Sequence, residues 1–413
     1  MLSNSTTRGA GYAIFVLTMM NLLNYLDRYV PSVVKDLFKH DLKLSDFETS
    51  LPITGFVIVY MLSSMMFGAL ADRYPRKVLI AAGVALWSLA TALAAFATGF
   101  WTFMLARALV GVGEAAYATL APALLSDFYA PERRNRILTI FYVAIPVGSA
   151  LGFILGGMFG QLYGWRAAFM ICGLPGILMA LLALWIRDPG RGRYDVDAEV
   201  TPPKWPEAIA LLLRNREYML VVAGYTVVTF ASGALADWFP TFLQRNRGMS
   251  IEMSGHYVGM SAVVGGLLGT ITGGFLADRL KKWTRQSYMA LSGWSMLLAT
   301  IFGFFALTLQ NAMSAVILLF FAQFFLWFYN GPVNAMLTNC VPSALRVRAF
   351  AFTILLIHIL GDAISPTIVG LASDYIGLQA AIQLVPIAMG IGAAIWLYTW
   401  RTLPEREVEK VVV

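Results

Sequence analysis

The chain has 413 residues, of which 59% are hydrophobic and only 13% are charged. Soluble domains carry roughly 25% charged residues, so this composition excludes an ordinary soluble protein and indicates a membrane protein. The formal net charge of +7 is explained by basic loops on one side of a membrane, so we expect no nucleic-acid partner.

Apolar segments long enough to span a bilayer, about 20 residues each, follow one another along the chain. Because backbone polar groups must all be paired in lipid, such segments are helical. We therefore predict an all-α, multi-pass membrane protein with twelve transmembrane helices. Their predicted ranges are 10–34, 50–71, 78–98, 101–126, 137–162, 168–187, 217–242, 252–277, 288–309, 312–338, 349–373 and 379–400.

The N-terminal residues lack a charged region followed by a cleavage site, so we expect the first helix to be permanent and not a signal peptide. It contains two adjacent charges, Asp27 and Arg28, and the fourth helix contains Arg107 and Glu114, seven residues apart on one face. A charge facing lipid at a helix centre costs about 2.5–3.5 kcal/mol, so the four charges should face one another or a water-filled interior. Gly111 should leave room there for a side chain, water or a ligand headgroup. A purely structural ion-pair cluster is the alternative.

These carboxylates are candidates for proton coupling. A carboxylate in a dry cavity has a raised pKa, and a neighbouring arginine lowers it again. A conformational change that moves Arg107 away from Asp27 or Glu114 would load a proton on one side of the membrane and release it on the other. Which of the two carboxylates dominates stays open.

A glycine-rich segment at 148–160 should form a groove that another helix can approach closely. The longest polar interval follows at 187–217, and its prolines and glycines divide the helices six and six. Within it, WPEAIALLLRNR could form a short amphipathic helix on the inner membrane surface. We predict an N-terminal six-helix bundle at 1–187, a cytoplasmic linker with this helix at 188–216 and a C-terminal six-helix bundle at 217–413.

The C-terminal half looks different. Seven aromatic residues lie between Phe320 and Tyr329 without a charge, and they suit either packing and lipid contact or a ligand. Helix breakers follow in NGPVNAM at 330–336 and HILGDAISP at 358–366, where backbone should line a cavity or pack on protein. His358 precedes Asp362 by four residues, on the same face. This histidine is either a packed core imidazole or a proton sensor that can also hydrogen-bond a substrate.

The two halves repeat each other. GALADR at 68–73 returns as GFLADR at 274–279, SDFETS at 45–50 has a counterpart in MSIEMS at 249–254, and Asp237 stands before Pro240 much as Asp27 stands before Pro31. In the first copy Ser45 and Glu48 predict a capping box that starts a helix. Internal duplication of this kind is typical of a transporter.

The basic residues indicate the orientation. Of the 30 Lys and Arg residues, 22 fall on one side of the predicted spans and six on the other. This asymmetry places both termini in the cytoplasm. The two cysteines, Cys172 and Cys340, lie in or beside apolar spans, so we expect packing roles and no disulfide.

At GALADRYPRK the sequence resembles the signature loop of the major facilitator superfamily, and the twelve spans with a central loop extend the resemblance over the whole chain. Pro75 stands where glycine is common, which affects the turn of the loop and not its charges. The resemblance implies that Asp72 holds the cytoplasmic gate closed, with basic partners beside it; topology alone is the alternative reason for these charges. The gate residues that it suggests are Gly68, Asp72, Arg73, Arg76, Lys77, Asp278 and Arg279.

A narrower resemblance is to the Spinster branch, carried by NYLDR at 24–28, RALVGVGEAAY at 107–117, the run at 121–152 and HILGDAISP. It implies a proton-linked exporter, from a family whose animal members move lysophospholipids or sphingosine phosphate. The polar core would then comprise Asp27, Arg28, Arg107, Glu114 and His358. Of these, we assign proton coupling to Asp27, Glu114, Arg107 and His358. The substrate-binding residues that we assign are Asn24, Tyr25, Arg28, Tyr117, Tyr142, Asn330, Asn334 and Asp362.

Together these features predict a secondary active transporter in which two six-helix bundles rock about a midplane cavity. The expected partners are an amphipathic lipid or small-molecule substrate, protons and membrane lipids. No HExxH or Walker A motif is present, so we expect neither an enzyme nor a cofactor or metal site. The brevity of the chain suggests a bacterial inner membrane, and we expect a monomer. A small polar solute, an organic acid or a drug as substrate, a channel or scramblase, and a receptor without transport are the rival functions.

Overall fold

The computed structural model describes residues 9–71, 73–190, 204–280, 286–342 and 345–402. These described ranges contain helices and no strand, which confirms the all-α fold. Ten of the described helices are long and apolar enough to cross a membrane. Helix α1 (Ala10–Val33) is less apolar than these ten but, at 24 residues, is long enough to span as well, and Gly164, at φ 83°, divides the 48-residue span 136–183 into two. The total agrees with the predicted twelve.

The chain forms two compact units. The first comprises residues 1–198, 236–263 and 366–381, and the second comprises 199–235, 264–365 and 382–413. These units do not follow the predicted division into 1–187 and 217–413, because two segments from the C-terminal half of the sequence pack with the N-terminal part. The division into two six-helix bundles therefore stays a prediction.

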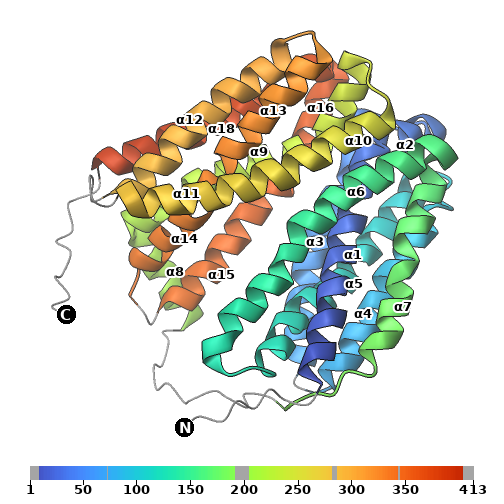
Figure 1. Cartoon of the computed structure of the whole chain (residues 1–413), viewed down its shortest axis with the longest axis vertical. Coiled ribbons are helices and arrows are strands. Elements are labelled where there is room, and N and C mark those ends of the chain that lie inside the picture. Colours follow the sequence, from blue (N-terminus) through green and yellow to red (C-terminus); the bar gives the residue numbers. More distant parts are fainter. Residues whose placement is uncertain (1–8, 72, 191–203, 281–285, 343–344, 403–413) are drawn as a thin grey trace. The chain divides into compact units, whose positions relative to one another are not determined.

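The first unit contains the N-terminal helices and parts of later ones (Figure 1). Its helices are α1, α2 (Lys35–Leu42), α3 (Asp46–Leu70), α4 (Arg76–Ala94), α5 (Phe100–Ser126), α6 (Pro131–Gly173), α7 (Pro175–Ala183), α10 (Ile251–Met260) and α17 (Leu378–Ala381). Helix α9 (Arg216–Arg247) enters this unit from residue 236, and α16 (Ser365–Ile376) enters it from residue 366.

The second unit holds the rest of the C-terminal half. Its elements are α8 (Trp205–Arg214), α11 (Gly266–Leu280), α12 (Ser287–Thr308), α13 (Ala312–Leu326), a 3-10 turn η2 (Trp327–Tyr329), α14 (Asn330–Asn339), α15 (Arg346–Ile357), a π-helical turn η4 (His358–Asp362) and α18 (Leu384–Thr402). Helix α8 lies where the sequence predicts an amphipathic helix. Its place on a membrane surface stays a prediction.

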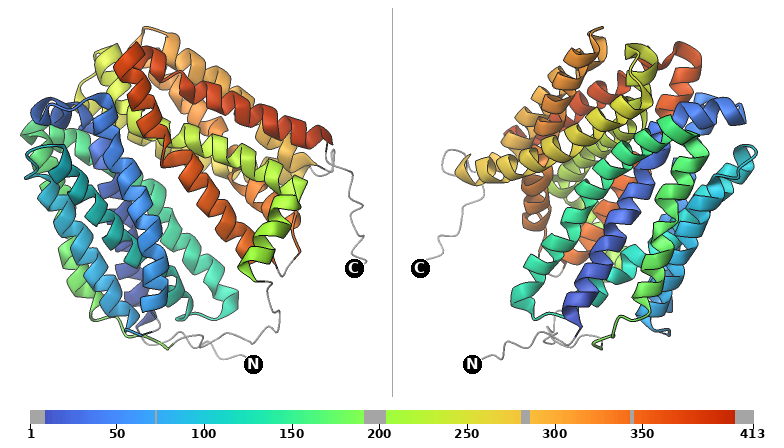
Figure 2. Two further views of the ribbon diagram at one scale, coloured as in Figure 1. Left: turned by 180° about the vertical axis from the view of Figure 1, so that it is seen from behind. Right: turned by 45° about the vertical axis from the view of Figure 1, so that its right-hand side comes forward.

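The glycine-rich segment of α6 packs closely against α1, and Figures 1 and 2 show the two helices running side by side. A methyl group on Gly148 would collide with the carbonyl oxygen of Leu22, and one on Gly152 would collide with that of Leu26. The groove predicted from the glycine spacing is therefore filled by α1. This contact fixes the helix that carries Asp27 and Arg28.

Local signals place the helix starts. The Ser45 hydroxyl accepts a hydrogen bond from the Glu48 amide at 3.1 Å, and the Glu48 carboxylate accepts one from the Ser45 amide at 2.9 Å. This is the predicted capping box, which opens α3. In the second copy Ser250 caps α10 by accepting from the Met253 amide at 3.2 Å. The two copies thus share the N-terminal serine cap.

Of the two predicted helix breaks, the one in HILGDAISP is present, whereas NGPVNAM at 330–336 lies within the helix α14 and the break falls just before it. The 3-10 turn at 327–329 directly precedes NGPVNAM, and the π-helical turn at 358–362 contains Gly361 in a non-helical conformation (φ −109°, ψ −107°). A second π-helical turn, η1 (Ser261–Gly265), interrupts the predicted span 252–277, which is the counterpart of the second span in the internal repeat. This interruption was not predicted. Such turns occur frequently at functional sites.

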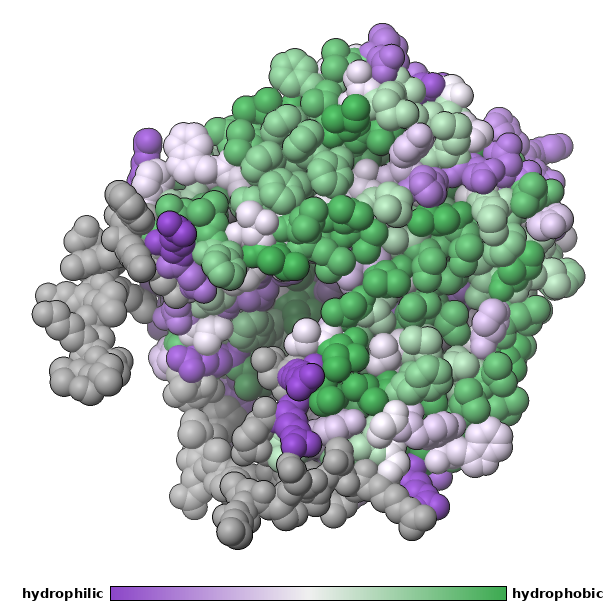
Figure 3. All heavy atoms as spheres, viewed as in Figure 1, coloured by the Kyte–Doolittle hydropathy of each residue, from purple (hydrophilic) through white to green (hydrophobic). Residues whose placement is uncertain are grey.

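Apolar side chains cover much of the face of the molecule that Figure 3 shows. On α11, for example, Leu268, Ile271 and Phe275 follow at helical spacing and are 47%, 64% and 80% exposed. A helix of a soluble protein would present polar residues there, so this surface fits contact with lipid. In the second unit Phe302 stacks on Phe321 and Phe325, with ring centroids 5.4 and 5.6 Å apart. Part of the aromatic run thus serves packing. Both cysteines are buried, which agrees with the packing roles predicted for them.

Candidate functional site: a buried charge cluster

The four charges predicted on α1 and α5 do meet in the first unit. Arg28 donates to one oxygen of Glu114, Oε2, from Nη2 at 2.6 Å and from Nε at 3.2 Å. Glu114 is completely buried, whereas the Arg28 side chain is 26% exposed. The principal ion pair therefore joins α1 to α5, and its cation faces the more open side. The sequence analysis placed Arg28 among the substrate contacts and did not foresee this pair.

The Arg28 guanidinium lies among aromatic rings. Its central carbon is 4.8 Å from the Tyr25 ring centroid, 5.1 Å from that of Phe56 and 5.5 Å from that of Tyr60. Such rings attract a cation through their quadrupole and shield it from water. Phe56 and Tyr60 come from α3, so three helices form the surroundings of this charge. The sequence analysis did not identify either residue, since neither belongs to a polar motif.

Several polar atoms of the cluster remain unsatisfied. Within the described part of the chain, Glu114 Oε1, Asp27 Oδ1 and Arg107 Nη1 are buried and make no hydrogen bond, and the same holds for Asn24 Nδ2. Asp27 and Arg107 are 1% and 2% exposed. Arg107 lies near enough to interact electrostatically with both carboxylates. Buried polar groups are ordinarily paired, so the two carboxylate oxygens indicate places for a proton or a water molecule, and the two nitrogen donors indicate places for a water molecule or a ligand acceptor.

The expected space at Gly111 is already occupied. A methyl group there would lie 2.6 Å from the carbonyl oxygen of Phe56 and 3.2 Å from the amide nitrogen of Tyr60. The glycine thus admits the backbone of α3 and not a ligand, and this part of the sequence prediction is wrong. The close approach has a function of its own, because it brings the Phe56 and Tyr60 rings to Arg28.

The tyrosines assigned to the substrate differ in their surroundings. Tyr117 is 1% exposed, and its hydroxyl donates to the carbonyl of Leu17 at 2.6 Å, so it packs in the core of the first unit. Tyr142 is 47% exposed and Tyr25 is partly buried beside Arg28. Only Tyr25 and Tyr142 are thus available to a ligand in this structure.

A second polar group lies in the other unit. His358 Nδ1 is 2.9 and 3.0 Å from the two carboxylate oxygens of Asp362, so the two residues share a face as predicted. Asn334 donates from Nδ2 to the backbone carbonyl of Asn330 at 2.7 Å. The side chains of His358 and Asp362 are about one-third exposed, at 37% and 31%. This exposure argues against a fully packed imidazole.

The predicted gate loop is only partly described, because Asp72 lies outside the described residues. Arg76 is 5% exposed and binds two other aspartates, Asp127 at 2.6 Å and Asp188 at 2.7 Å. Lys77 donates to the carbonyl of Leu184 at 3.1 Å. These contacts join the start of α4 to the ends of α5 and α7, and neither aspartate was recognised from the sequence.

The remaining assigned gate residues lie at the ends of α3 and α11. Gly68 and Arg73 are in the first unit, and Asp278 and Arg279 are in the second. The Tyr288 hydroxyl donates to Asp278 at 3.3 Å. A methyl group on Gly68 would meet nothing within 4 Å, so this glycine is not required by packing in the structure.

The described residues contain no group of three or more His, Cys, Asp or Glu that could hold a metal ion. The cluster itself offers ions and hydrogen bonds: a buried carboxylate pair with two arginines, one of them partly exposed, among apolar helices. Ionisable groups within membrane spans mark paths for ions, protons or substrates. The fold and this cluster together define the class of a secondary membrane transporter.

Comparison with known proteins makes the assignment specific. The Major Facilitator Superfamily profile matches residues 17–361. Protein spinster of Drosophila melanogaster is 36% identical over 385 residues, which are 90% of this chain and 63% of that protein. Protein spinster homolog 1 of Homo sapiens is 34% identical over 420 residues, covering 94% of this chain and 80% of that one. The chain thus spans somewhat less than two thirds of the Drosophila relative.

A solved structure shares the fold over nearly the full length. The crystal structure of a bacterial homologue of the human lysosomal transporter Spinster, inward-facing and unoccupied, has a TM-score of 0.86 and 22% identity and covers 96% of this chain and 98% of its own. The same homologue in an occupied, inward-facing state gives a TM-score of 0.84. The chain belongs to the major facilitator superfamily and, within it, to the Spinster family. It is a membrane transporter and not an enzyme.

Proposed function

We propose that this protein is a proton-coupled secondary active transporter that works by alternating access on an amphipathic lipid-like substrate, such as a lysophospholipid or a sphingoid lipid. The observation that carries the proposal is the incomplete pairing of the cluster: Arg28 binds one oxygen of Glu114, and the other oxygen makes no hydrogen bond within the described residues. A carboxylate held on one side only can accept a proton on its other oxygen while the hydrogen bonds to the first oxygen remain in place.

Asp27 supports a coupled pair of carboxylates. It is almost completely buried, and it interacts electrostatically with both Glu114 and Arg107. Two carboxylates that share one buried region do not ionise independently. Movement of Arg107 toward or away from either one would change which of them holds a proton. The pair His358 and Asp362 is a second candidate for proton binding, as the sequence analysis expected.

Arg28 supports an anionic or zwitterionic headgroup as ligand. It is the accessible cation of the cluster, and α3 beside it exposes a run of apolar side chains that includes Leu62 at 60% and Met65 at 71%. A phosphate could bind the guanidinium through paired hydrogen bonds, while an acyl chain lies along apolar surface. Tyr25, Tyr142, Asn24, Asn330 and Asn334 would complete the recognition of the substrate.

The positive-inside asymmetry supports cytoplasmic termini, and the superfamily loop supports a cytoplasmic gate built on Asp72, Arg73 and Arg76. We further propose a monomer of two six-helix bundles, joined through a cytoplasmic linker at 188–216, in a bacterial inner membrane. We call the side of the membrane opposite to the two termini the outer side.

The coupling is tested in proteoliposomes with an imposed pH gradient. Glu114→Gln and Asp27→Asn should each abolish pH-driven uptake of a labelled lysophospholipid, because each removes a proton site while keeping the shape of the side chain. Asp41→Asn, a carboxylate outside the cluster, serves as the matched control and should transport normally. If both cluster variants keep the pH dependence of the wild type, the assignment of coupling is wrong.

The substrate class is tested separately by ligand-induced thermal shift. A panel of lysophospholipids and sphingoid lipids should raise the melting temperature, because a ligand that binds only the folded state stabilises it. Sugars, organic acids and cationic drugs form the comparison panel. A shift confined to that second panel would reject a lipid substrate, and downhill flux that ignores pH would indicate a channel or scramblase.

A further inference from the structure

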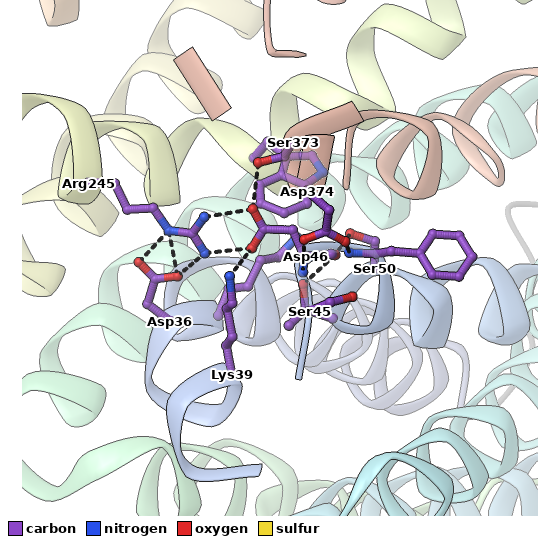
Figure 4. A network of polar contacts seen from close by, with 12 residues as sticks. Asp36, Lys39, Ser45, Asp46, Ser50, Arg245, Ser373 and Asp374 are labelled. Atoms are coloured by element: carbon purple, nitrogen blue, oxygen red, sulfur yellow. Dashed lines mark hydrogen bonds and ion pairs between the residues drawn. The ribbon is translucent and has the colours of Figure 1, made fainter. Parts of the chain in front are cut away.

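A second, separate network of charges lies in the first unit, around the start of α3 (Figure 4). The orientation proposed above puts it on the outer side. Asp46, at the start of α3, is its centre. Its Oδ1 accepts from Lys39 at 2.5 Å and from Arg245 Nη2 at 2.9 Å, and its Oδ2 accepts from Arg245 Nη1 at 2.8 Å and from Ser373 at 2.5 Å. Asp46 is 3% exposed, so a nearly buried carboxylate has four donors.

The partners of Asp46 are themselves held. Arg245 donates from Nε to both oxygens of Asp36 at 2.9 Å, in addition to a shorter contact from Nη2. Asp374 accepts from the backbone amides of Asp46 at 2.8 Å and Phe47 at 2.9 Å. These amides belong to the first turn of α3 and have no acceptor within the helix. The helix dipole also favours a carboxylate at this end. A side chain of α16 therefore caps a helix more than 300 residues away in sequence.

A buried pair extends the network along α9. Lys35 is 1% exposed and donates to Asp237, and the Ser32 hydroxyl donates to the same carboxylate at 3.2 Å. The ammonium also lies 3.7 Å from the ring centroid of Trp238. Burial lowers the pKa of the Lys35 ammonium, and Asp237 opposes that change. The sequence analysis used these residues only to orient the chain and to mark the internal repeat.

Apart from the pair of Lys39 with Asp46, the contacts share one property: each joins the first 50 residues to a segment from the C-terminal half of the sequence. The cations and anions on α2 and α3 bind Asp237 and Arg245 on α9, or Ser373 and Asp374 on α16. Backbone approach is close at the same place. A methyl group on Gly370 would lie 2.7 Å from the Asp46 carbonyl oxygen and 2.9 Å from the Ser50 hydroxyl oxygen. Packing and charge thus act on the same pair of helix ends.

We propose that this network is an outer latch, which holds the outer ends of α9 and α16 against α2 and α3 and must release before the substrate path opens on that side. The proposal rests on the proposed transport function and orientation. An ionic latch suits a reversible gate, because water solvates the separated charges once the ends part, whereas a solid apolar seam offers no such compensation. Asp46 and Arg245 make the central ion pairs of the latch. Among the described residues, neither forms a hydrogen bond with Asp27 or Glu114.

The latch is tested by cysteine accessibility in the full-length chain. Thr241 is fully buried and lies one turn from Asp237 and one turn from Arg245 on α9. In a background with Cys172 and Cys340 replaced by alanine, Thr241→Cys reports opening through its rate of reaction with a membrane-impermeant maleimide added from the outer side. Arg245→Ala should raise this rate about tenfold or more, because it removes the donor of both Asp36 and Asp46. Arg245→Lys, which keeps one charge, should fall between.

Two further variants keep the result interpretable. Asp41→Asn removes the partner of Arg166, an ionic contact on the same side that joins α2 to α6 within the N-terminal part, and should leave the rate unchanged. Gly370→Ala keeps every charge and pushes the helix ends apart, so it should raise the rate as well. If Arg245→Ala does not fold, Asp374→Asn removes only the cap on α3 and gives the same test at smaller amplitude.

An unchanged maleimide rate in both Arg245→Ala and Gly370→Ala would overturn the latch. An equal rise in Asp41→Asn would also overturn it, since any lost surface charge would then act alike. The measurement needs neither substrate nor pH gradient. Faster labelling without pH-driven uptake would therefore keep the latch and reject proton coupling, and normal uptake with unchanged labelling would reject the latch alone.

Discussion

The charges around Glu114 and the charges around Asp46 lie in one compact unit, yet they differ in how completely their polar atoms are paired. Both oxygens of Asp46 accept two hydrogen bonds each. In the cluster on α1 and α5, Glu114 uses one oxygen, and Asp27 and Arg107 each keep a buried atom without a partner among the described residues. A saturated network has no capacity left for a ligand, so its role is to hold helices. An unsaturated one retains capacity to bind.

The largest effect that separates the two groups is expected from Arg107→Ala. This change leaves Asp27 and Glu114 with Arg28 as the cation of the cluster, and removing one partner of a buried charge group typically costs about 3–5 kcal/mol. We expect a lower melting temperature in detergent and loss of substrate-induced stabilisation. Arg107→Lys is the control, since it keeps the charge and should restore most of the stability. A melting temperature equal to that of the wild type would mean that Arg107 is solvated and that the cluster is wet throughout.

An intermediate effect is expected from Ser373→Ala, which removes one of the four donors to Asp46. A hydrogen bond to a charged group contributes about 1.5–3 kcal/mol, but the three remaining donors compensate in part, so we expect about 1 kcal/mol. In the Thr241→Cys background, labelling from the outer side should rise by roughly fivefold, the equivalent of that free energy. A rise as large as that of Arg245→Ala would show that the hydroxyl, and not the ion pairs, limits opening.

Much of the fold could be predicted because its signals are local. Apolar length predicts spans, Ser45 with Glu48 predicts the start of α3, and the spacing of Gly148 and Gly152 predicts a close helix partner. The residues of the buried cluster were also recognised, because a charge within an apolar helix is costly wherever it points. Their position within apolar segments was enough to single out Asp27, Arg28, Arg107 and Glu114.

The pairing of these charges could not be predicted, since it depends on helix rotation and on which helices touch. The expected cation for Glu114 was Arg107, but Arg28 binds it, and Phe56 and Tyr60 enter the site through the close approach at Gly111. The network around Asp46 was missed for a related reason. Its charges lie at predicted span ends, where Lys and Asp are ordinary, and only the three-dimensional fold brings α16 to the start of α3. The spacing of Asp36 and Lys39 on one short helix was the one available signal.

The smallest effect is expected where an ion pair is neither buried nor placed between the two halves of the sequence. Asp41 binds Arg166 and accepts from the Trp165 indole at 3.0 Å, but the side chains of Asp41 and Arg166 are 44% and 45% exposed. Exposed pairs typically contribute less than about 1 kcal/mol, because water and salt screen them. Asp41→Asn should therefore change the melting temperature little, and added salt should reduce even that difference. A loss of melting temperature in Asp41→Asn that approaches the loss in Arg107→Ala would contradict this reasoning. Burial and complete hydrogen bonding would then no longer distinguish charges that stabilise the fold from charges that merely lie on its surface.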